Sequence, residues 1–277
     1  MDELEKIKQV EYNILEDFDG VCKKLNIRYT LAYGTLLGAV RHKGFIPWDD
    51  DIDVAMLRED YDIFLEKGQE LLKENYFLQT YETDKNYLGN FAKIRDMSTN
   101  LIEYTTQSLN SKSGIYIDIF PIERVCSNKI INKLDILLYS IIYIVKNSAT
   151  IELAYNSKSK IKKILHLILF PLAKIIGVQR LNRIETYIKA KNSNIKNRNK
   201  NNNVYVMDPK PFKFNNSLSI SVEKFLEFTE IEFEKGKFQT IMDYDLFLNK
   251  CYGEYMKLPP IEEQKSNHKF IKVEFLK

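Results

Sequence analysis

Four aspartates stand among five consecutive residues in the first quarter of the chain: Asp49, Asp50, Asp51 and Asp53. Ile52 separates Asp51 from Asp53, and the four residues after Asp53 are apolar. This pattern predicts a buried strand over 51–57. Side chains alternate along a strand, so Asp51 and Asp53 share one face. Carboxylates this close repel each other unless a cation lies between them, and oxygen ligands of this kind suit Mg²⁺ or Mn²⁺. The spacing therefore predicts a metal site.

Two other interpretations of the acidic run compete with a catalytic metal site. A calcium loop of the EF-hand type requires Gly at its sixth position and Glu at its twelfth, and counting from Asp49 these positions hold Val54 and Asp60. That interpretation is rejected. The second is a solvated acidic turn, because runs of charge usually face water. Residues elsewhere in the chain decide between this turn and a metal site.

Two further segments carry chemistry that a metal-bound phosphate needs. Tyr33-Gly34-Thr35 ends one predicted strand and opens a helix, a geometry in which backbone N–H groups face a phosphate. Asp118 is the single carboxylate in the strand-like run 115–120, where isoleucines flank it. A lone acid in so apolar a strand needs a partner to offset its desolvation. Asp118 is therefore a candidate third member of the site.

These segments together resemble a known signature. A strand, a Gly-Thr turn and a helix, followed by Asp-Ile-Asp-Val and then Ile-Asp-Ile, resemble the three-part pattern of the nucleotidyltransferase (polymerase β-like) fold. The longer strings 34–41 and 47–53 resemble one branch of that superfamily, the LicD family, bacterial phosphocholine transferases related to fukutin and fukutin-related protein. Further similar strings lie at 93–95, 117–121 and 252–260, whereas 125–200 is similar in character only.

The resemblance implies a metal-dependent phosphotransferase. Such an enzyme typically moves phosphocholine from CDP-choline to a sugar hydroxyl of a cell-surface glycan precursor, in teichoic acid or lipopolysaccharide biosynthesis, and releases CMP. The partners expected are CDP-choline or another CDP-alcohol and a lipid-linked glycan acceptor. The alternatives are transfer of ribitol, glycerol or ethanolamine phosphate, a glycosyltransferase whose Asp-x-Asp binds a nucleotide sugar, a true nucleotidyltransferase that releases pyrophosphate, and a non-catalytic scaffold.

Particular residues are expected to carry this chemistry. Asp51 and Asp53 are predicted metal ligands, Asp49 a further ligand or a supporting group, and Asp118 either a third ligand or the general base. Groups predicted to contact the nucleotide phosphates are Gly34, Thr35, Arg41, Lys93 and Arg95, although the three basic residues are equally well explained as ordinary surface charge. Aromatic faces usually hold a quaternary ammonium, and the candidates are Tyr33, Trp48 and Tyr116.

The composition limits the class of protein. Hydrophobic residues make up 44% and charged residues 29% of the 277 positions, which is typical of a folded globular chain. A net charge of +3 is too small to indicate nucleic-acid binding. The three cysteines, Cys22, Cys126 and Cys251, are far apart, so neither disulfides nor a zinc site is expected. The acidic start of the chain does not resemble a secretory signal, and a cytoplasmic location, at or near the inner face of the membrane, is expected.

Hydrophobic periodicity predicts an α+β fold, a nucleotidyltransferase-type mixed-sheet core with a helical insertion. The division expected is a catalytic core at 1–125, a helical insertion at 126–203, and a segment at 204–277 that completes the catalytic unit. Helices are predicted at 2–25, 35–43 and 58–75, then over most of 129–191 and again after 241. Strands are predicted at 28–33, 51–57, 76–81, 91–96, 100–104, 115–120, 204–207 and 228–241, and the Asn-rich composition of 191–203 indicates an exposed loop.

The two most apolar stretches are 134–145 and 161–178. Each is shorter than the roughly 20 residues needed to cross a bilayer, or is broken by charge and Pro171. The second carries Lys162, Lys163 and Lys174 beside its apolar residues, which is typical of a helix that lies in a membrane interface. A buried helical pair that covers the sheet is the other interpretation. Peripheral membrane contact is therefore one of two expectations for this region.

Overall fold

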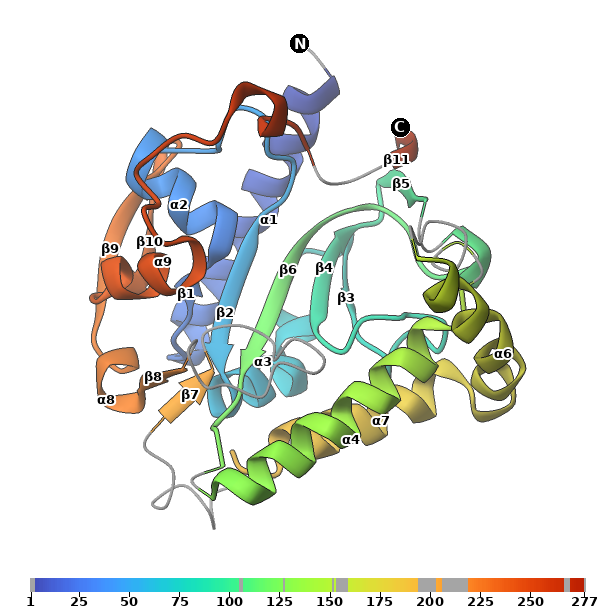
Figure 1. Ribbon diagram of the computed structural model, residues 1–277. Helices are drawn as coiled ribbons and strands as arrows, with labels where there is room; N and C mark the ends of the chain where they lie inside the picture. The colour runs from blue at the N-terminus through green and yellow to red at the C-terminus, as the bar shows by residue number, and fades with distance from the viewer. Residues whose placement is uncertain are drawn as a thin grey trace.

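The computed structural model describes residues 3–104, 107–126, 128–150, 152, 159–193, 203–205, 219–266 and 270–276 (Figure 1). A five-stranded sheet lies at its centre. In spatial order its strands are β1 (Thr30–Leu31), β2 (Asp53–Leu57), β6 (Ile115–Ile122), β4 (Ala92–Asp96) and β3 (Tyr76–Gln79). Strands β2 and β6 run parallel, and every other neighbouring pair in this sheet is antiparallel. The sheet is therefore mixed, as the α+β prediction requires.

The register of this sheet brings three of the predicted site residues together. Asp53 on β2 pairs with Asp118 on β6, and Asp118 pairs on its other side with Lys93 on β4. The backbone N–H of Asp118 also donates to the carbonyl of Ile52 at 2.8 Å. Residues that are far apart along the chain thus become direct neighbours across adjacent strands.

Helices and a hairpin surround the β1–β2 side of the sheet. Helix α1 (Glu3–Leu25) passes behind β2, α3 (Arg58–Leu71) follows directly from β2, and α2 (Tyr33–His42) lies beside α9 (Tyr244–Tyr252) (Figure 1). The antiparallel hairpin of β9 (Phe228–Phe233) and β10 (Gly236–Ile241) continues beyond β1, and the short helix α8 (Val222–Phe225) precedes it. Phe233, Phe238 and Phe247 share one hydrophobic core with residues of α1 and α2. The C-terminal part of the chain therefore packs on the same core as the N-terminal part.

Three helices form a separate layer on the other side of the molecule. They are α4 (Lys129–Asn147), α6 (Lys160–Ile176) and α7 (Val178–Ala190), and α4 packs along both of the others (Figure 1). Their own small core consists of Val145, Ala149, Ala173 and Leu181. No helix among the described residues combines the length and the hydrophobicity that crossing a bilayer requires.

Two further antiparallel pairs lie outside the main sheet. Strand β5 (Thr99–Glu103) pairs with β11 (Phe270–Phe275), and β7 (Asn203–Tyr205) pairs with β8 (Ser219–Ser221). Single 3-10 turns occur at η1 (Gln107–Leu109) and η3 (Ile261–Glu263). The pairing of β5 with β11 ties residues 270–275 to the segment that follows β4.

Most predicted elements are confirmed, and the differences have physical reasons. The strand predicted at 51–57 begins at Asp53, because pairing with β6 begins there and Asp51 lies in the preceding loop. The strand predicted at 28–33 is only two residues long, and the helix predicted at 58–75 ends at Leu71. The segment 228–241 is not one strand but a hairpin that turns at Glu234, whose φ is 54°. Strand β11 was not predicted. Most of the Asn-rich stretch, 194–202, lies outside the described residues, as do positions 206–207, and the three-part division stays a prediction.

Candidate active site

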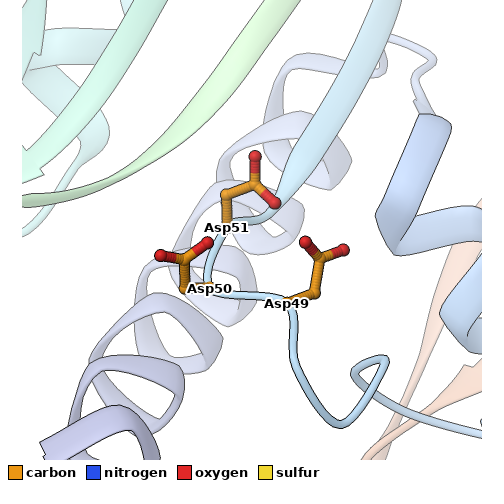
Figure 2. Close-up of side chains that lie close together, drawn as sticks. All are labelled: Asp49, Asp50 and Asp51. Atoms are coloured by element: carbon orange, nitrogen blue, oxygen red, sulfur yellow. The ribbon is translucent and has the colours of Figure 1, made fainter. Parts of the chain in front are cut away.

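The acidic run forms a compact loop at the start of β2. Figure 2 shows the side chains of Asp49, Asp50 and Asp51 projecting from this loop, and one carboxylate oxygen of each lies within 4.8 Å of the others. Asp50 is buried, and the other two are half-buried. The structure therefore brings the predicted ligands Asp49 and Asp51 together, and adds Asp50, which the sequence analysis left out of the site.

Contacts from both ends of the chain hold this loop in place. The ammonium of Lys8 on α1 donates to the carbonyls of Ile46 at 3.3 Å and Pro47 at 3.0 Å, just before the acidic run. The hydroxyl of Ser266 donates to Asp50 at 2.7 Å. Because both contacts are partly or wholly buried, the position of the three carboxylates is fixed by the tertiary fold rather than by the loop alone.

The first turn of α2 packs directly against the acidic loop. A Cβ on Gly34 would lie 2.5 Å from Asp49 Oδ2, so a larger residue here would displace this carboxylate from its place beside the positive end of the helix dipole. Thr35 is buried, and its hydroxyl accepts the backbone N–H of Asp53 at 2.8 Å. Thr35 thus fixes the start of β2 to α2, and in this arrangement its oxygen serves the fold instead of facing open solvent. Tyr33 begins the helix with a strained φ of 44°.

Asp53, Asp118 and Lys93 form a buried electrostatic group beside this loop. Lys93 Nζ lies 2.8 Å from Asp118 Oδ1, and both side chains are almost wholly buried. Burial raises the pKa of Asp53 well above its ordinary value, and Asp51, Asp118 and Asp49 raise it further, whereas Lys93 opposes the rise. Burial also raises the pKa of Asp118, against the lowering effect of Lys93. The ion pair therefore compensates only part of the negative charge.

Glu11 is a member of this acidic group that the sequence analysis missed. It lies on α1, is 2% exposed, and its Oε2 has no hydrogen-bond partner among the described residues. Burial raises its pKa well above the ordinary value, and Asp51, Asp50, Asp49 and Asp118 raise it further. On sequence alone Glu11 is one of several glutamates in an amphipathic helix, and only its polar side chain at a core-facing position could have marked it.

The side chains around the acids favour an oxygen-binding divalent cation. Every candidate ligand among them is a carboxylate, and the pKa of Glu11, Asp53 and Asp118 is raised in each case, so negative charge is in excess. Hard cations such as Mg²⁺ and Mn²⁺ prefer oxygen ligands, and bound charge would relieve the repulsion. The residues present therefore fit the expected metal: Asp49, Asp50 and Asp51 are close enough together to share one ion, and the predicted ligands Asp53 and Asp118 belong to the same negatively charged region.

A cavity of about 760 Å³ opens beside Asp53 and Lys93. Six aromatic residues contribute to its wall, and they come from α2, the loop before β4, β6 and α4: Tyr33, Tyr87, Phe91, Phe120, Tyr139 and Tyr143. The rings of Phe120 and Phe91 lie 4.5 Å apart between centroids, and those of Phe120 and Tyr33 lie 5.3 Å apart. The acidic group therefore adjoins a pocket whose wall combines a cluster of aromatic rings with polar and charged side chains.

Two of the three predicted aromatic candidates are used elsewhere. Lys93 lies over the ring of Tyr116, 3.2 Å from its centroid, and Arg95 covers the same ring at 4.7 Å. Trp48 packs edge-on against His42 and does not line the cavity. Tyr33 does line it, so the structure places one of the three at the predicted position.

The predicted basic residues also differ in their surroundings. Lys93 and Arg95 both line the cavity, but Arg95 donates to Gln79 Oε1 at 2.5 Å and to the carbonyl of Gly114 at 2.8 Å, so protein groups already use its Nε and Nη1. Arg41 is in the last turn of α2 and donates to His42 and to the carbonyl of Tyr255. Arg95 and Arg41 therefore hold the fold together at their present positions, whereas Lys93 directly faces a site carboxylate.

Tyr252 on α9 is 45% exposed, yet partial burial of its hydroxyl raises the pKa of this group, and Cys251, Asp53, Asp49 and Asp51 raise it further. Burial lowers the pKa of Arg41, and Tyr252 opposes that effect. Tyr252 opens the late motif 252–260, which most of the chain separates from the acids in sequence.

Similarity to known proteins extends along most of the chain. A family described as "LicD/FKTN/FKRP, nucleotidyltransferase domain" matches residues 26–175. The lipopolysaccharide cholinephosphotransferase LicD of Haemophilus influenzae is 33% identical over 273 residues, which cover 92% of each chain. The human ribitol 5-phosphate transferase FKRP is 49% identical over 41 residues, 15% of this chain and 8% of its own. An uncharacterized protein of Rickettsia prowazekii is 49% identical over 49 residues, 18% of each chain. The chain belongs to the LicD family.

We predict that Glu11→Gln stabilises the metal-free protein and that the gain grows with pH. Because the pKa of Glu11 is raised in the folded state, its contribution to stability is fully present below its unfolded pKa and is lost as pH rises through the folded pKa. Removing a buried charge whose Oε2 has no hydrogen-bond partner among the described residues should stabilise the protein by about 1–3 kcal/mol near pH 8, and by little near pH 5. Thermal unfolding in EDTA at several pH values measures this.

Glu66→Gln, on the exposed side of α3, is the matched control and should show no pH-dependent difference from wild type. Added Mg²⁺ should narrow the gap between Glu11→Gln and wild type at high pH, because a cation relieves the same repulsion. A Glu11→Gln variant that is less stable than wild type at high pH would contradict this account of the acidic group.

We predict that Lys93→Met destabilises the protein by about 3–5 kcal/mol, because it leaves Asp118 buried without its cation. The double variant Lys93→Met/Asp118→Asn should recover part of the loss. Lys224→Met, which breaks an exposed pair with Asp243, should change stability by less than about 1 kcal/mol. Urea denaturation compares the four proteins, and equal stability of Lys93→Met and wild type would show that the buried pair contributes nothing.

Proposed function

We propose that the protein transfers phosphocholine from CDP-choline to a sugar hydroxyl of a cell-surface glycan precursor and releases CMP. Family membership and the similarity along 92% of the chain to a cholinephosphotransferase support a phospho-alcohol transferase. A CDP-linked donor, a lipid-linked glycan acceptor and a cytoplasmic location are parts of the same proposal. The core would then be a nucleotidyltransferase-type domain, which fits its mixed sheet and the description of the matching family.

One observation supports choline over other alcohols. Asp118 and Phe120 lie two residues apart on β6 and so share one face of the strand, about 7 Å apart along it. Phe120 packs against Tyr33 and Phe91 in the wall of the cavity. The carboxylates are therefore followed along one strand by aromatic faces, and aromatic faces attract quaternary ammonium groups. This order matches a donor whose phosphate is followed by a trimethylammonium.

The acidic group would bind the diphosphate end of the donor. Asp49, Asp50, Asp51 and Asp53 are the residues that would hold Mg²⁺ or Mn²⁺. When bound, this ion neutralises the diphosphate and the leaving CMP. The first turn of α2 at Gly34 directs its N–H groups toward the same region, which favours negative charge. Lys93 adds a cation on the cavity side. Together these groups would orient the donor for in-line attack.

In the transfer step the acceptor hydroxyl oxygen would attack the choline-phosphate phosphorus. A bond forms between that oxygen and phosphorus, and the phosphorus–oxygen bond to CMP breaks, so that CMP leaves with the electron pair. The acceptor's proton would pass to Asp118, whose pKa is raised by burial and which is therefore a stronger base than an ordinary carboxylate. Lys93, 2.8 Å from Asp118 Oδ1, would hold the carboxylate in position.

Transfer of ribitol phosphate is the second candidate. The similarity to the human ribitol 5-phosphate transferase favours it, although that similarity covers 15% of this chain. A ribityl group carries hydroxyls and no positive charge, so it would gain less from an aromatic wall than choline would. Thermal-shift measurements with Mg²⁺ and CDP-choline, CDP-ribitol, CDP-glycerol or CDP-ethanolamine rank the donors directly. Stabilisation by nucleotide sugars alone would instead favour the glycosyltransferase alternative.

We predict that Asp53→Asn and Asp118→Asn both reduce CMP release from CDP-choline by at least about 10³-fold, but for different reasons. Asp53→Asn should also lose Mn²⁺ binding in calorimetry, because it removes a ligand. Asp118→Asn should retain Mn²⁺ binding, because it removes the base. Glu66→Gln should behave as wild type in both assays. Loss of Mn²⁺ binding in Asp118→Asn would make Asp118 a ligand and overturn its role as base.

We predict that Phe120→Leu raises KM for CDP-choline by about 5–30-fold, since a cation–π contact in a desolvated pocket contributes about 1–2 kcal/mol. KM for CDP-glycerol, where that donor is used, should change by less than about twofold. Tyr143→Leu on α4 lines the same cavity and tests the opposite wall. An equal rise for both donors would show that the ring provides packing and not recognition of the positive charge.

A further inference from the structure

The outer side of the α4–α6 layer exposes an unusually apolar surface. Helix α6 buries a single residue, Ala173, against its neighbours. Ile161 and Ile175 are each 80% exposed and Ile168 is 66% exposed. Ten exposed apolar residues of α4 and α6 make up what we call the outer apolar surface. They are Ile130, Leu134, Leu138 and Ile141 of α4, and Ile161, Ile164, Leu165, Ile168, Leu172 and Ile175 of α6. Scattered exposed apolar residues are ordinary, but ten of them on two helices that pack together mark an interaction site.

The exposed Lys, Arg, Asp and Glu side chains of α4 and α6 themselves are all positively charged. Helix α6 contains no acidic residue, and four lysines punctuate it: Lys160, Lys162, Lys163 and Lys174. Helix α4 adds the exposed Lys129 and Lys133. Its one acid, Asp135, is buried and lies 2.5 Å from Lys191, so it does not offset these charges at the surface. A partner for this face would therefore be both apolar and negatively charged.

We propose that the outer apolar surface docks on an anionic lipid bilayer, with α4 and α6 lying in the membrane interface. A helix with apolar residues over most of its surface and lysines at its edges inserts its apolar side between lipid headgroups and attracts anionic lipids. Helix α6 has 17 residues and contains Pro171, which suits a helix that lies in the interface plane better than one that crosses the bilayer. Of the two interpretations made from the sequence, a buried helical pair does not fit this degree of exposure.

The position of α4 connects this surface with the cavity. Tyr139, Tyr143 and Lys146 on its inner side line the cavity, while Leu134, Leu138 and Ile141 belong to the outer apolar surface. A helix is about 10–12 Å across with its side chains, so docking would bring the cavity within about one helix diameter of the lipid headgroups. Under the proposed function, this is where a lipid-linked acceptor would present its sugar.

Flotation with vesicles tests the docking directly and needs neither donor nor turnover. Wild type should float with vesicles that contain phosphatidylglycerol and should bind pure phosphatidylcholine vesicles at least about fivefold less. Ile164→Glu/Ile168→Glu should lower binding at least about tenfold. Ile261→Glu, 75% exposed on the distant turn η3, is the matched control and should bind as wild type. Circular dichroism checks that each variant is folded.

A second pair of variants tests whether binding depends on the lysines of α6 in particular or only on the net positive charge of the protein. Lys162→Gln/Lys163→Gln/Lys174→Gln should weaken binding to anionic vesicles and reduce its salt dependence. Lys67→Gln/Lys235→Gln/Lys237→Gln removes three exposed lysines elsewhere and should have little effect. Equal losses in both triple variants would indicate non-specific attraction and overturn the assignment to α6.

Depth of insertion gives a readout that mere adsorption would not produce. Brominated lipids should quench the fluorescence of Ile168→Trp strongly and that of Ile261→Trp weakly, with Trp48 present equally in both. No flotation of wild type with anionic vesicles would overturn the proposal. A stable dimer in solution that Ile164→Glu/Ile168→Glu dissociates would also overturn it, because a second copy of the chain would then cover this surface. The donor thermal-shift assay is independent of every one of these outcomes.

Discussion

The parallel pairing of β2 with β6 is the constraint on which the site depends. It sets Asp53 beside Asp118 in a buried position, and the antiparallel pairing of β4 with β6 adds Lys93 to the same group. One lysine compensates only part of the negative charge that Glu11 and the acidic loop contribute. The fold therefore places several carboxylates that repel one another in one region, and the large hydrophobic core offsets the cost of this repulsion. Because the carboxylates destabilise one another, the region is well suited to binding a cation.

Much of the site could be predicted because its chemistry depends on short-range spacing and a recognisable pattern. The alternation around Asp51 and Asp53, the Gly34 turn and the isoleucine-flanked Asp118 are all visible in the order of the residues. Glu11 could not be found in this way, since its role arises from the packing of α1 behind the loop. Arg95 was predicted to contact phosphate, but its hydrogen bonds to Gln79 on the neighbouring strand β3 and to Gly114 just before β6 depend on strand pairing, which leaves no signal in the sequence around Arg95.

The fold was predictable where hydrophobic periodicity was strong, as in α1, β6 and α4. Pairing across long sequence distances was not: β11 was missed because its short run became a strand only through its partner β5. The start of β2 was placed too early, since the sequence pattern cannot tell where hydrogen bonding to β6 begins. For α6, the pattern predicted an apolar helix. Whether its apolar side is buried against protein or exposed depends on how α6 packs with α4 and α7, which the sequence does not reveal.

The contact of Ser266 with Asp50 has a consequence for synthesis of the chain. These residues are 216 positions apart, and β11 follows Ser266 within a few residues. A nascent chain on the ribosome can form α1, α2 and the central strands before residue 266 emerges from the exit tunnel. Until then the acidic loop lacks the hydrogen bond from Ser266 to Asp50. A polypeptide truncated before residue 266 would therefore carry all of these carboxylates without the contact that fixes Asp50.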